Sequence, residues 1–144
     1  MKILITGVSA RAIAESAVHS GYSVVALDAF GDLDLKELCE CYSLSKDFQL
    51  SFSARALDTA SCQIQFDGVA YTANLENYPD VVMRLASNHA LLGNSPETLH
   101  HVRHWPELFH TLAQAGFRVP DTIYAGDGRQ PEPGLQWLRK PLRG

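Results

Sequence analysis

The chain has 144 residues, of which 46% are hydrophobic and 19% are charged, and this composition predicts one compact domain with a buried core. The net charge of −4 argues against a nucleic-acid or anionic-membrane partner. No apolar run approaches the roughly 18 residues of a membrane-spanning helix, and the N-terminus lacks a signal-peptide core, so we expect a cytoplasmic protein.

The first 28 residues predict a β-α-β unit with parallel strands. Residues 2–6 (KILIT) and 22–27 (YSVVAL) are short apolar runs of the kind found in buried parallel strands. Between them, apolar residues recur at helical spacing. Ser9 is the expected N-cap of this helix and Gly21 its C-terminal stop. Such a unit implies a right-handed crossover and a sheet covered on both faces.

The middle of the chain continues the alternation of strands and helices. Proline, glycine and capping signals divide it into segments of ordinary length. We expect a loop or short helix at 31–38, a strand at 42–44, a helix at 51–60, a strand at 66–71, a helix at 79–86 and a very short strand at 91–93.

The last third has a different character. One helix is expected after Ser95-Pro96-Glu97 and another over residues 106–115, which Gly116 ends. Strands are expected at 122–125 and 135–140, separated by a loop rich in glycine and proline. A terminal strand leaves backbone groups unpaired, so we expect more chain normally to follow Gly144.

Several short motifs, in order along the chain, resemble the N-terminal domain of biotin-carboxylase-like ATP-grasp enzymes. Leu75-Glu76-Asn77 resembles an "LSEN" turn, residues 93–99 (GNSPETL) a "GPSPEAI" segment, and residues 115–120 (AGFRVP) an "AGVPVP" turn. Residues 137–141 (WLRKP) resemble the strand that carries a "KP" lysine. Residues 7–11 and 28–32 are similar to the start of predicted ATP-dependent carboligases related to biotin carboxylase.

This resemblance covers nearly the whole chain and implies its fold and domain organisation. The expected fold is a three-layer, Rossmann-like α/β domain in which helices flank a parallel sheet. Residues 1–120 would form this pre-ATP-grasp domain, and residues 121–144 would begin a truncated ATP-grasp domain. The partner implied is the C-terminal ATP-grasp domain of the same polypeptide.

The resemblance also implies a function for the full-length protein. ATP-grasp enzymes use ATP and Mg²⁺ to phosphorylate a carboxylate, and an amine or another nucleophile then displaces the phosphate. The metal ligands of the family lie downstream of these 144 residues, so we expect the fragment to be inactive, to hold no tightly bound cofactor and to contribute substrate binding and domain packing.

The resemblance assigns candidate roles to particular residues. Lys140 would contact phosphate, ahead of a glycine-rich flap interrupted at Arg143-Gly144. Where the family has a nucleotide-contacting "DK" pair, this chain has His104-Trp105, and the neighbouring Arg103 is the candidate substitute.

A carboxylate substrate would bind at the turn after the first strand, where open α/β sheets bind ligands. The candidates for this contact are Gly7, Ser9, Arg11 and Glu76. Tight-turn geometry, a solvated arginine and a loop-fixing glutamate are the alternative interpretations of these residues.

Residue types that often bind metals do not predict a metal site here. The spacing of Cys39 and Cys41 fits neither a zinc ribbon nor a redox motif, and Cys62 stands apart from them. His100, His101 and His104 are interpreted as one exposed helix face, because no Cys or carboxylate completes a ligand set.

Two other functions are considered. A stand-alone nucleotide- or NAD(P)-binding domain would explain Gly7 followed by Asp28, but the sequence lacks G-x-G-x-x-G and has Ser9 in place of the second glycine. A protein-interaction module, including a homodimer, would use the apolar surface intended for a missing domain. The identity of the carboxylate and of the nucleophile is not encoded in these residues.

Overall fold

A computed structural model describes residues 1–141. Five parallel strands form one sheet in the order β3-β2-β1-β4-β5. The strands are β1 (Lys2–Thr6), β2 (Ser23–Asp28), β3 (Glu40–Ser43), β4 (Gly68–Tyr71) and β5 (Ala90–Leu91). The helices around them are α1 (Arg11–His19), α2 (Leu33–Leu38), α3 (Leu44–Asp47), α4 (Ala54–Ser61), the 3₁₀ turn η1 (Leu75–Asn77) and α5 (Pro79–Leu85). The expected α/β fold class is therefore confirmed.

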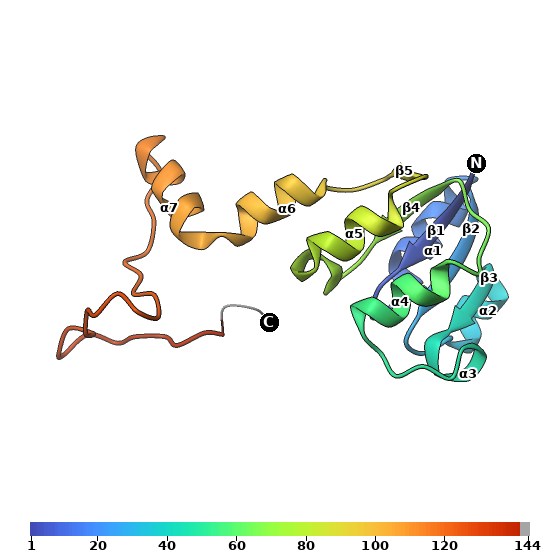
Figure 1. The fold of residues 1–144 in the computed structure, drawn as a ribbon, viewed down its shortest axis with the longest axis horizontal. Helices are drawn as coiled ribbons and strands as arrows, with labels where there is room; N and C mark the ends of the chain where they lie inside the picture. Colours follow the sequence, from blue (N-terminus) through green and yellow to red (C-terminus); the bar gives the residue numbers. More distant parts are fainter. Residues whose placement is uncertain (142–144) are drawn as a thin grey trace. The chain divides into compact units, whose positions relative to one another are not determined.

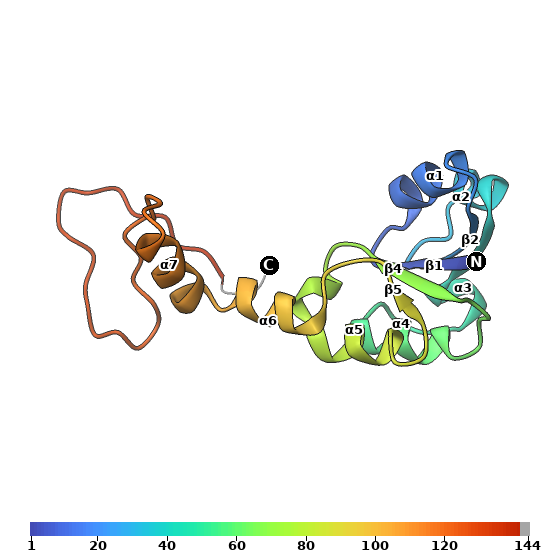
Figure 2. The same cartoon turned by 90° about the horizontal axis from the view of Figure 1, so that it is seen from above.

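The helices lie in two layers, one on each face of the sheet. α1 and α2 lie on one face, and α3, α4 and α5 lie on the other (Figures 1 and 2). β1 is central and pairs with β2 on one side and β4 on the other, with Ile3 opposite Val24 and Gly68. Since the crossovers before β4 and after it use the opposite face from α1, the sheet is doubly wound about β1.

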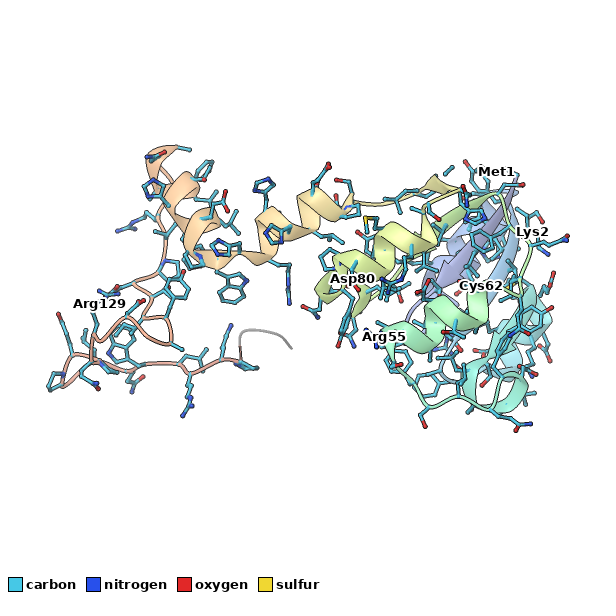
Figure 3. All side chains as sticks on the ribbon, viewed as in Figure 1. Met1, Lys2, Arg55, Cys62, Asp80 and Arg129 are labelled. Carbon is cyan, nitrogen blue, oxygen red and sulfur yellow. The ribbon has the colours of Figure 1, made fainter. Side chains whose placement is uncertain are left out.

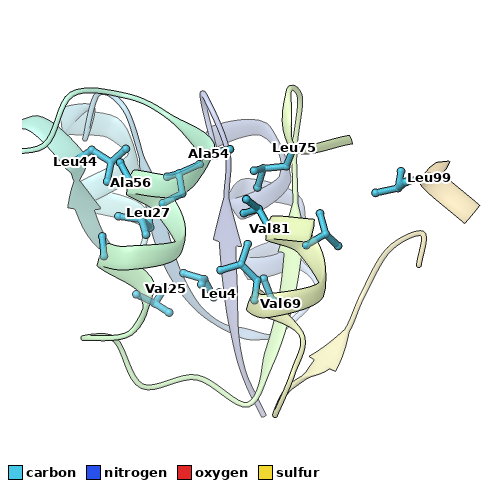
Figure 4. Close-up of a cluster of buried hydrophobic side chains, with 14 residues drawn as sticks. Leu4, Val25, Leu27, Leu44, Ala54, Ala56, Val69, Leu75, Val81 and Leu99 are labelled. Atoms are coloured by element: carbon cyan, nitrogen blue, oxygen red, sulfur yellow. The ribbon is translucent and has the colours of Figure 1, made fainter. Parts of the chain in front are cut away.

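Alternate residues of the central strands supply two separate hydrophobic clusters. Leu4 and Val69 point toward α4 and α5 and join the larger cluster (Figure 4), whereas Ile3 and Ile5 pack with Ala14 of α1. This division follows from the twofold side-chain period of a strand. Because both faces are buried, the strands are continuous apolar runs rather than alternating ones, as the sequence predicted.

Glycine ends helix α1 through a specific hydrogen-bond pattern. After α1, Gly21 takes a φ of 83°; its N–H donates to the carbonyl of Val18 at 2.9 Å, while Tyr22 N–H donates to Ala17 at 3.1 Å. This is a Schellman motif, which needs the left-handed conformation that glycine adopts readily. The predicted role of Gly21 is thus confirmed. In residues 1–141, no helix is both long and apolar enough to cross a membrane.

The chain divides into two compact units, Met1–His100 and a second that starts at His101. Helix α6 (Pro96–Arg103) spans this boundary, and α7 (Trp105–Gln114) belongs to the second unit. The division of the sequence at residue 120 into a pre-ATP-grasp domain and the start of an ATP-grasp domain stays a prediction.

The strands expected at 122–125 and 135–140 do not form, and that prediction was wrong. Residues 115–141 contain no strand or helix. A strand needs a neighbour for its N–H and C=O groups, and no described segment of the second unit provides one. The flap expected at Arg143-Gly144 lies outside the described residues.

The core makes a direct prediction about stability. Replacing Leu4, which is fully buried, with alanine should lower the free energy of unfolding by about 2–5 kcal/mol, because the lost contacts leave a cavity. Leu33 is 81% exposed, and Leu33→Ala is the matched control, expected to change stability by less than about 0.5 kcal/mol. Urea unfolding measures both. Equal effects of the two substitutions would contradict the assigned core.

Candidate functional site

The carboxyl ends of β1 and β4 lie side by side at the centre of the sheet. Their register pairs Thr6 with Tyr71, and the chain leaves β1 toward α1 on one face and β4 toward α5 on the other. In open α/β sheets, this point of divergence is where ligands bind, because the two loops separate and leave a crevice. The structure thus places Gly7, Ser9 and Glu76 in the two loops that meet there.

The turn after β1, Gly7-Val8-Ser9, is fastened to both neighbouring strand ends. Val8 N–H donates to the carbonyl of Ala73 at 3.2 Å, and Ala29 N–H donates to the carbonyl of Val8 at 3.3 Å. These bonds run in opposite directions across the carboxyl edge. Two backbone hydrogen bonds therefore anchor the turn at Val8, and a loop anchored in this way would lose less entropy on binding a ligand.

Thr72 contacts this turn directly, although no sequence pattern singles it out. Its Oγ1 donates a hydrogen bond to the carbonyl of Ser9 at 3.1 Å. A side chain on Gly7 would overlap Thr72 Oγ1 and would lie 3.0 Å from Thr72 Cβ. Gly7 is therefore required because Thr72 occupies the space that a Cβ would fill. No local pattern reveals this, because Ser9 and Thr72 are 63 residues apart.

The start of α1 is held by Asp28 rather than by Ser9, so the expected serine cap was wrong. The N-cap is Ala10, whose N–H donates to Asp28 Oδ2 at 3.0 Å. Asp28 is fully buried, and its Oδ1 accepts from Phe30 N–H at 2.9 Å and from Gly31 N–H at 2.8 Å. A carboxylate with three backbone donors satisfies this burial.

The same contacts bear on the dinucleotide interpretation. In that fold, an acidic residue at the end of the second strand hydrogen-bonds a ribose hydroxyl. Here both oxygens of Asp28 accept hydrogen bonds from backbone donors and the side chain is not exposed. These contacts favour a structural role for Asp28, in which it holds the start of α1 and the turn after β2, over a ribose-binding role.

Arg11 opens α1 beside the turn and points into solvent. Its Nη1 forms an ion pair with Asp34 Oδ2, and both side chains are more than half exposed. The hydrogen bond from Arg11 lowers the pKa of the Asp34 carboxyl group, so the pair is fully charged at neutral pH. An exposed pair of this kind contributes little to stability, so an incoming carboxylate can compete with Asp34 for the guanidinium.

Glu76 stabilises its own loop. Its Oε2 accepts from the N–H of Asn74 at 3.1 Å, and Asn77 Nδ2 donates to Asn74 Oδ1 at 3.1 Å. Asn74 has a φ of 127°, a conformation that costs free energy in a residue with a side chain and needs such support. The loop-fixing interpretation of Glu76 therefore has direct contacts behind it, while a contact with substrate stays a prediction.

The two candidate nucleotide-binding residues belong to the second unit. Arg103 is the last residue of α6 and is half-buried, and Lys140 is exposed in a segment without regular structure. Their contact with a nucleotide stays a prediction.

The described cysteines and the potential metal-binding residues provide no reactive thiol or metal site at the carboxyl edge of the sheet. Burial raises the pKa of Cys41 to about 11, which keeps the thiol protonated and unreactive at neutral pH. The exposed Cys62 lies at the C-terminal end of α4 (Figure 3), the opposite end of the helix from the carboxyl edge. No group of three or more His, Cys, Asp or Glu residues within 1–141 is arranged to hold a metal ion.

The first unit also contains an apolar groove. It is bordered by α1 and β1, and its lining includes Ile3, Ile13, Tyr22 and Leu92. No residue of the lining carries a charged side chain. Met1 also lines the groove, but its ammonium group is already paired with Asp67 Oδ2 at 3.9 Å. A carboxylate that entered this mostly apolar groove would lose its hydration, so the groove suits the substrate implied by the sequence less well.

Comparison with known proteins supports the fold assignment. No family model and no curated protein matches the sequence. Among solved structures, the chain is similar to the "Biotin Carboxylase domain of single-chain bacterial carboxylase", with a TM-score of 0.68 and 21% sequence identity over 88% of this chain. The chain spans 32% of the length of that structure. The expected likeness to the biotin carboxylase fold is therefore confirmed.

The packing of Gly7 against Thr72 predicts a paired mutational effect. Gly7→Ala should lower the free energy of unfolding by about 1–3 kcal/mol, because the new methyl group overlaps the Thr72 hydroxyl. In a Thr72→Ala background, part of this penalty should disappear, since the hydroxyl has been removed. Chemical denaturation of the four proteins in this cycle measures the coupling. Strictly additive effects would contradict the packing.

Proposed function

We propose that this chain is the N-terminal, substrate-contacting domain of an ATP-dependent carboxylate–amine (or similar) ligase of the ATP-grasp type. The single observation that carries the proposal is the fold likeness to a biotin carboxylase domain over 88% of the chain. The ordered motifs of the sequence, from the Gly7 turn to Lys140-Pro141, point to the same group of enzymes.

The chemistry proposed for the full-length protein is activation of a carboxylate by ATP and Mg²⁺. A carboxylate oxygen takes the terminal phosphoryl group to give an acyl phosphate and ADP, and the nucleophile then displaces inorganic phosphate. Such a reaction needs cations around the phosphates as charge moves to the leaving group. Lys140 and Arg103 are the residues of this chain proposed for that role.

The turn at the carboxyl edge would bind the carboxylate substrate. Arg11 supplies a guanidinium with the planar geometry that suits a carboxylate, and its present partner Asp34 is exposed and exchangeable. Gly7 and Ser9 would present backbone to the substrate, and Glu76 would shape the facing loop or contact the substrate itself. These roles concern binding and orientation, and no residue of this chain is proposed to make or break a covalent bond.

The remaining catalytic parts are proposed to come from a C-terminal ATP-grasp domain of the same polypeptide. The 144-residue chain alone is then expected neither to turn over ATP nor to hold a cofactor tightly. A cytoplasmic location and the possibility of a homodimer stay predictions from the sequence.

A dinucleotide-binding domain is the second candidate. The strand order β3-β2-β1-β4-β5 is also that of dinucleotide-binding sheets. Its expected ribose contact, Asp28, accepts three backbone hydrogen bonds instead. The ligase proposal is therefore favoured.

Calorimetric titration with succinate tests the proposed substrate site. Arg11→Gln should weaken binding about tenfold or more, the loss expected when a charged hydrogen bond is removed. Asp34→Asn should strengthen binding, because Arg11 loses its competing carboxylate.

Arg129→Gln provides the matched control for this titration. Arg129 is also an exposed arginine paired with an aspartate, Asp121, but it belongs to the second unit (Figure 3). Equal effects of Arg11→Gln and Arg129→Gln would reject the turn as the binding site. Release of phosphate from ATP by the unmodified chain would contradict the proposed need for a second domain.

A further inference from the structure

The end of β4 contacts two segments that are distant from each other in the sequence. Thr72 contacts the Gly7–Ser9 turn, and its own N–H donates to the carbonyl of Thr6 at 2.8 Å, extending the pairing of β4 with β1. Tyr71, the residue before it, donates its phenolic hydrogen to the carbonyl of Asn94 at 2.9 Å. One strand end therefore holds both the candidate substrate turn and the segment that leads from β5 into α6.

The contacts of Tyr71 fix the segment after β5. A side chain on Gly93 would lie only 2.9 Å from Tyr71 Cε1, so the backbone of Gly93 lies directly against the phenol ring. Tyr71 is half-buried, and its burial raises the pKa of the phenol, which keeps the hydroxyl a donor to Asn94. Immediately beyond, Ser95 Oγ accepts from Thr98 N–H at 3.2 Å and its carbonyl accepts from Leu99 N–H at 2.9 Å.

The two side chains act on opposite sides of one extended backbone. Successive residues of a strand point to opposite faces. Tyr71 packs with the cluster that includes α4 and α5, whereas Thr72 reaches Ser9 on the way to α1. Since only one peptide bond separates them, a displacement of the strand end that breaks one contact also moves the other.

We propose that Tyr71 and Thr72 are positioning residues that couple the conformation of the Gly7–Ser9 turn to that of residues 93–95, through which the chain passes into α6. Ordering of the turn stabilises the strand end, and the strand end in turn stabilises the exit segment. This coupling is a property of the ligand-free chain. It rests on the proposed function only for the identity of what binds the turn.

Amide hydrogen exchange of the chain without ligand tests the coupling. Thr72→Val keeps the side-chain shape but removes the donor to Ser9. It should speed exchange at Val8 and Ala29 by about two- to tenfold, the change expected from one hydrogen bond. The coupling predicts a smaller, measurable increase at Thr98 and Leu99 as well. Thr72→Ser, which retains the hydroxyl, should restore the original rates at all four amides.

Tyr71→Phe is the reciprocal experiment. It removes the donor to Asn94 and should speed exchange chiefly at Thr98 and Leu99, with a smaller increase at Val8 and Ala29. Reciprocity is required if one strand end connects the two segments.

Two substitutions of the same chemistry serve as controls. Thr59→Val removes a hydroxyl that donates to the Arg55 carbonyl within α4, and Tyr42→Phe removes one that donates to the Glu40 carboxylate. Neither should change the four reporter amides. The Leu57 amide in α4 reports global opening and should keep its rate in every variant.

Two results would overturn the proposal. In the first, each of Thr72→Val and Tyr71→Phe changes only its own pair of amides, which would make the contacts independent. In the second, all amides including Leu57 accelerate together, which would make the residues contributors to global stability alone. The exchange experiment contains no succinate, so its result does not depend on the proposed function. The coupling and the proposed function can therefore fail separately.

Discussion

The buried carboxylate of Asp28 is the constraint on which the candidate site depends. A charged group inside a protein is tolerated when hydrogen-bond donors surround it, and here the donors are the N–H groups of Ala10, Phe30 and Gly31. One side chain at the end of β2 therefore fixes both the start of α1 and the turn after β2. The Gly7–Ser9 turn lies between β1 and α1. Because Asp28 holds Ala10, it fixes the point at which the chain leaves the turn and enters α1.

Thr72 constrains the same turn from the end of β4, which pairs with β1 on the side opposite β2. It holds the Ser9 carbonyl and fills the space beside Gly7, so the turn has fixed neighbours at its beginning and at its end. What remains adjustable is the ion pair of Arg11 with Asp34, which is exposed and charged. The site thus combines an anchored backbone turn with an exposed arginine. Asp32 and Glu15 also act on the charge of Arg11, so an anion must displace Asp34 in order to bind there.

The sequence alone was sufficient for features that depend on local signals. The apolar runs of β1 and β2 and the glycine at position 21 predict the first β-α-β unit, because burial and the left-handed conformation leave direct marks on residue type. The role of Asp28 was less accessible. Its bond to Ala10 spans 18 residues, whereas Ser9 has the ordinary features of an N-cap. The importance of Thr72 needed the β1–β4 pairing, which no local pattern supplies.

The two strands wrongly predicted in the last third of the chain also failed because strand formation depends on distant partners. Residues 122–125 and 135–140 have strand-like composition, but a strand forms only with a neighbour that accepts its hydrogen bonds. Within the second unit, the described residues offer none. Composition favours strands in these segments, but strand formation depends on partners that composition does not reveal.

We propose that this domain binds a carboxylate at the turn on the carboxyl edge between β1 and β4. Amide chemical-shift mapping during titration with succinate tests it over the whole chain at once. We expect saturable shifts concentrated in residues 7–11 and 72–76, with Asp34 also affected as Arg11 changes partner. Shifts concentrated in the groove lined by Ile13 and Leu92, or confined to the second unit, would contradict it.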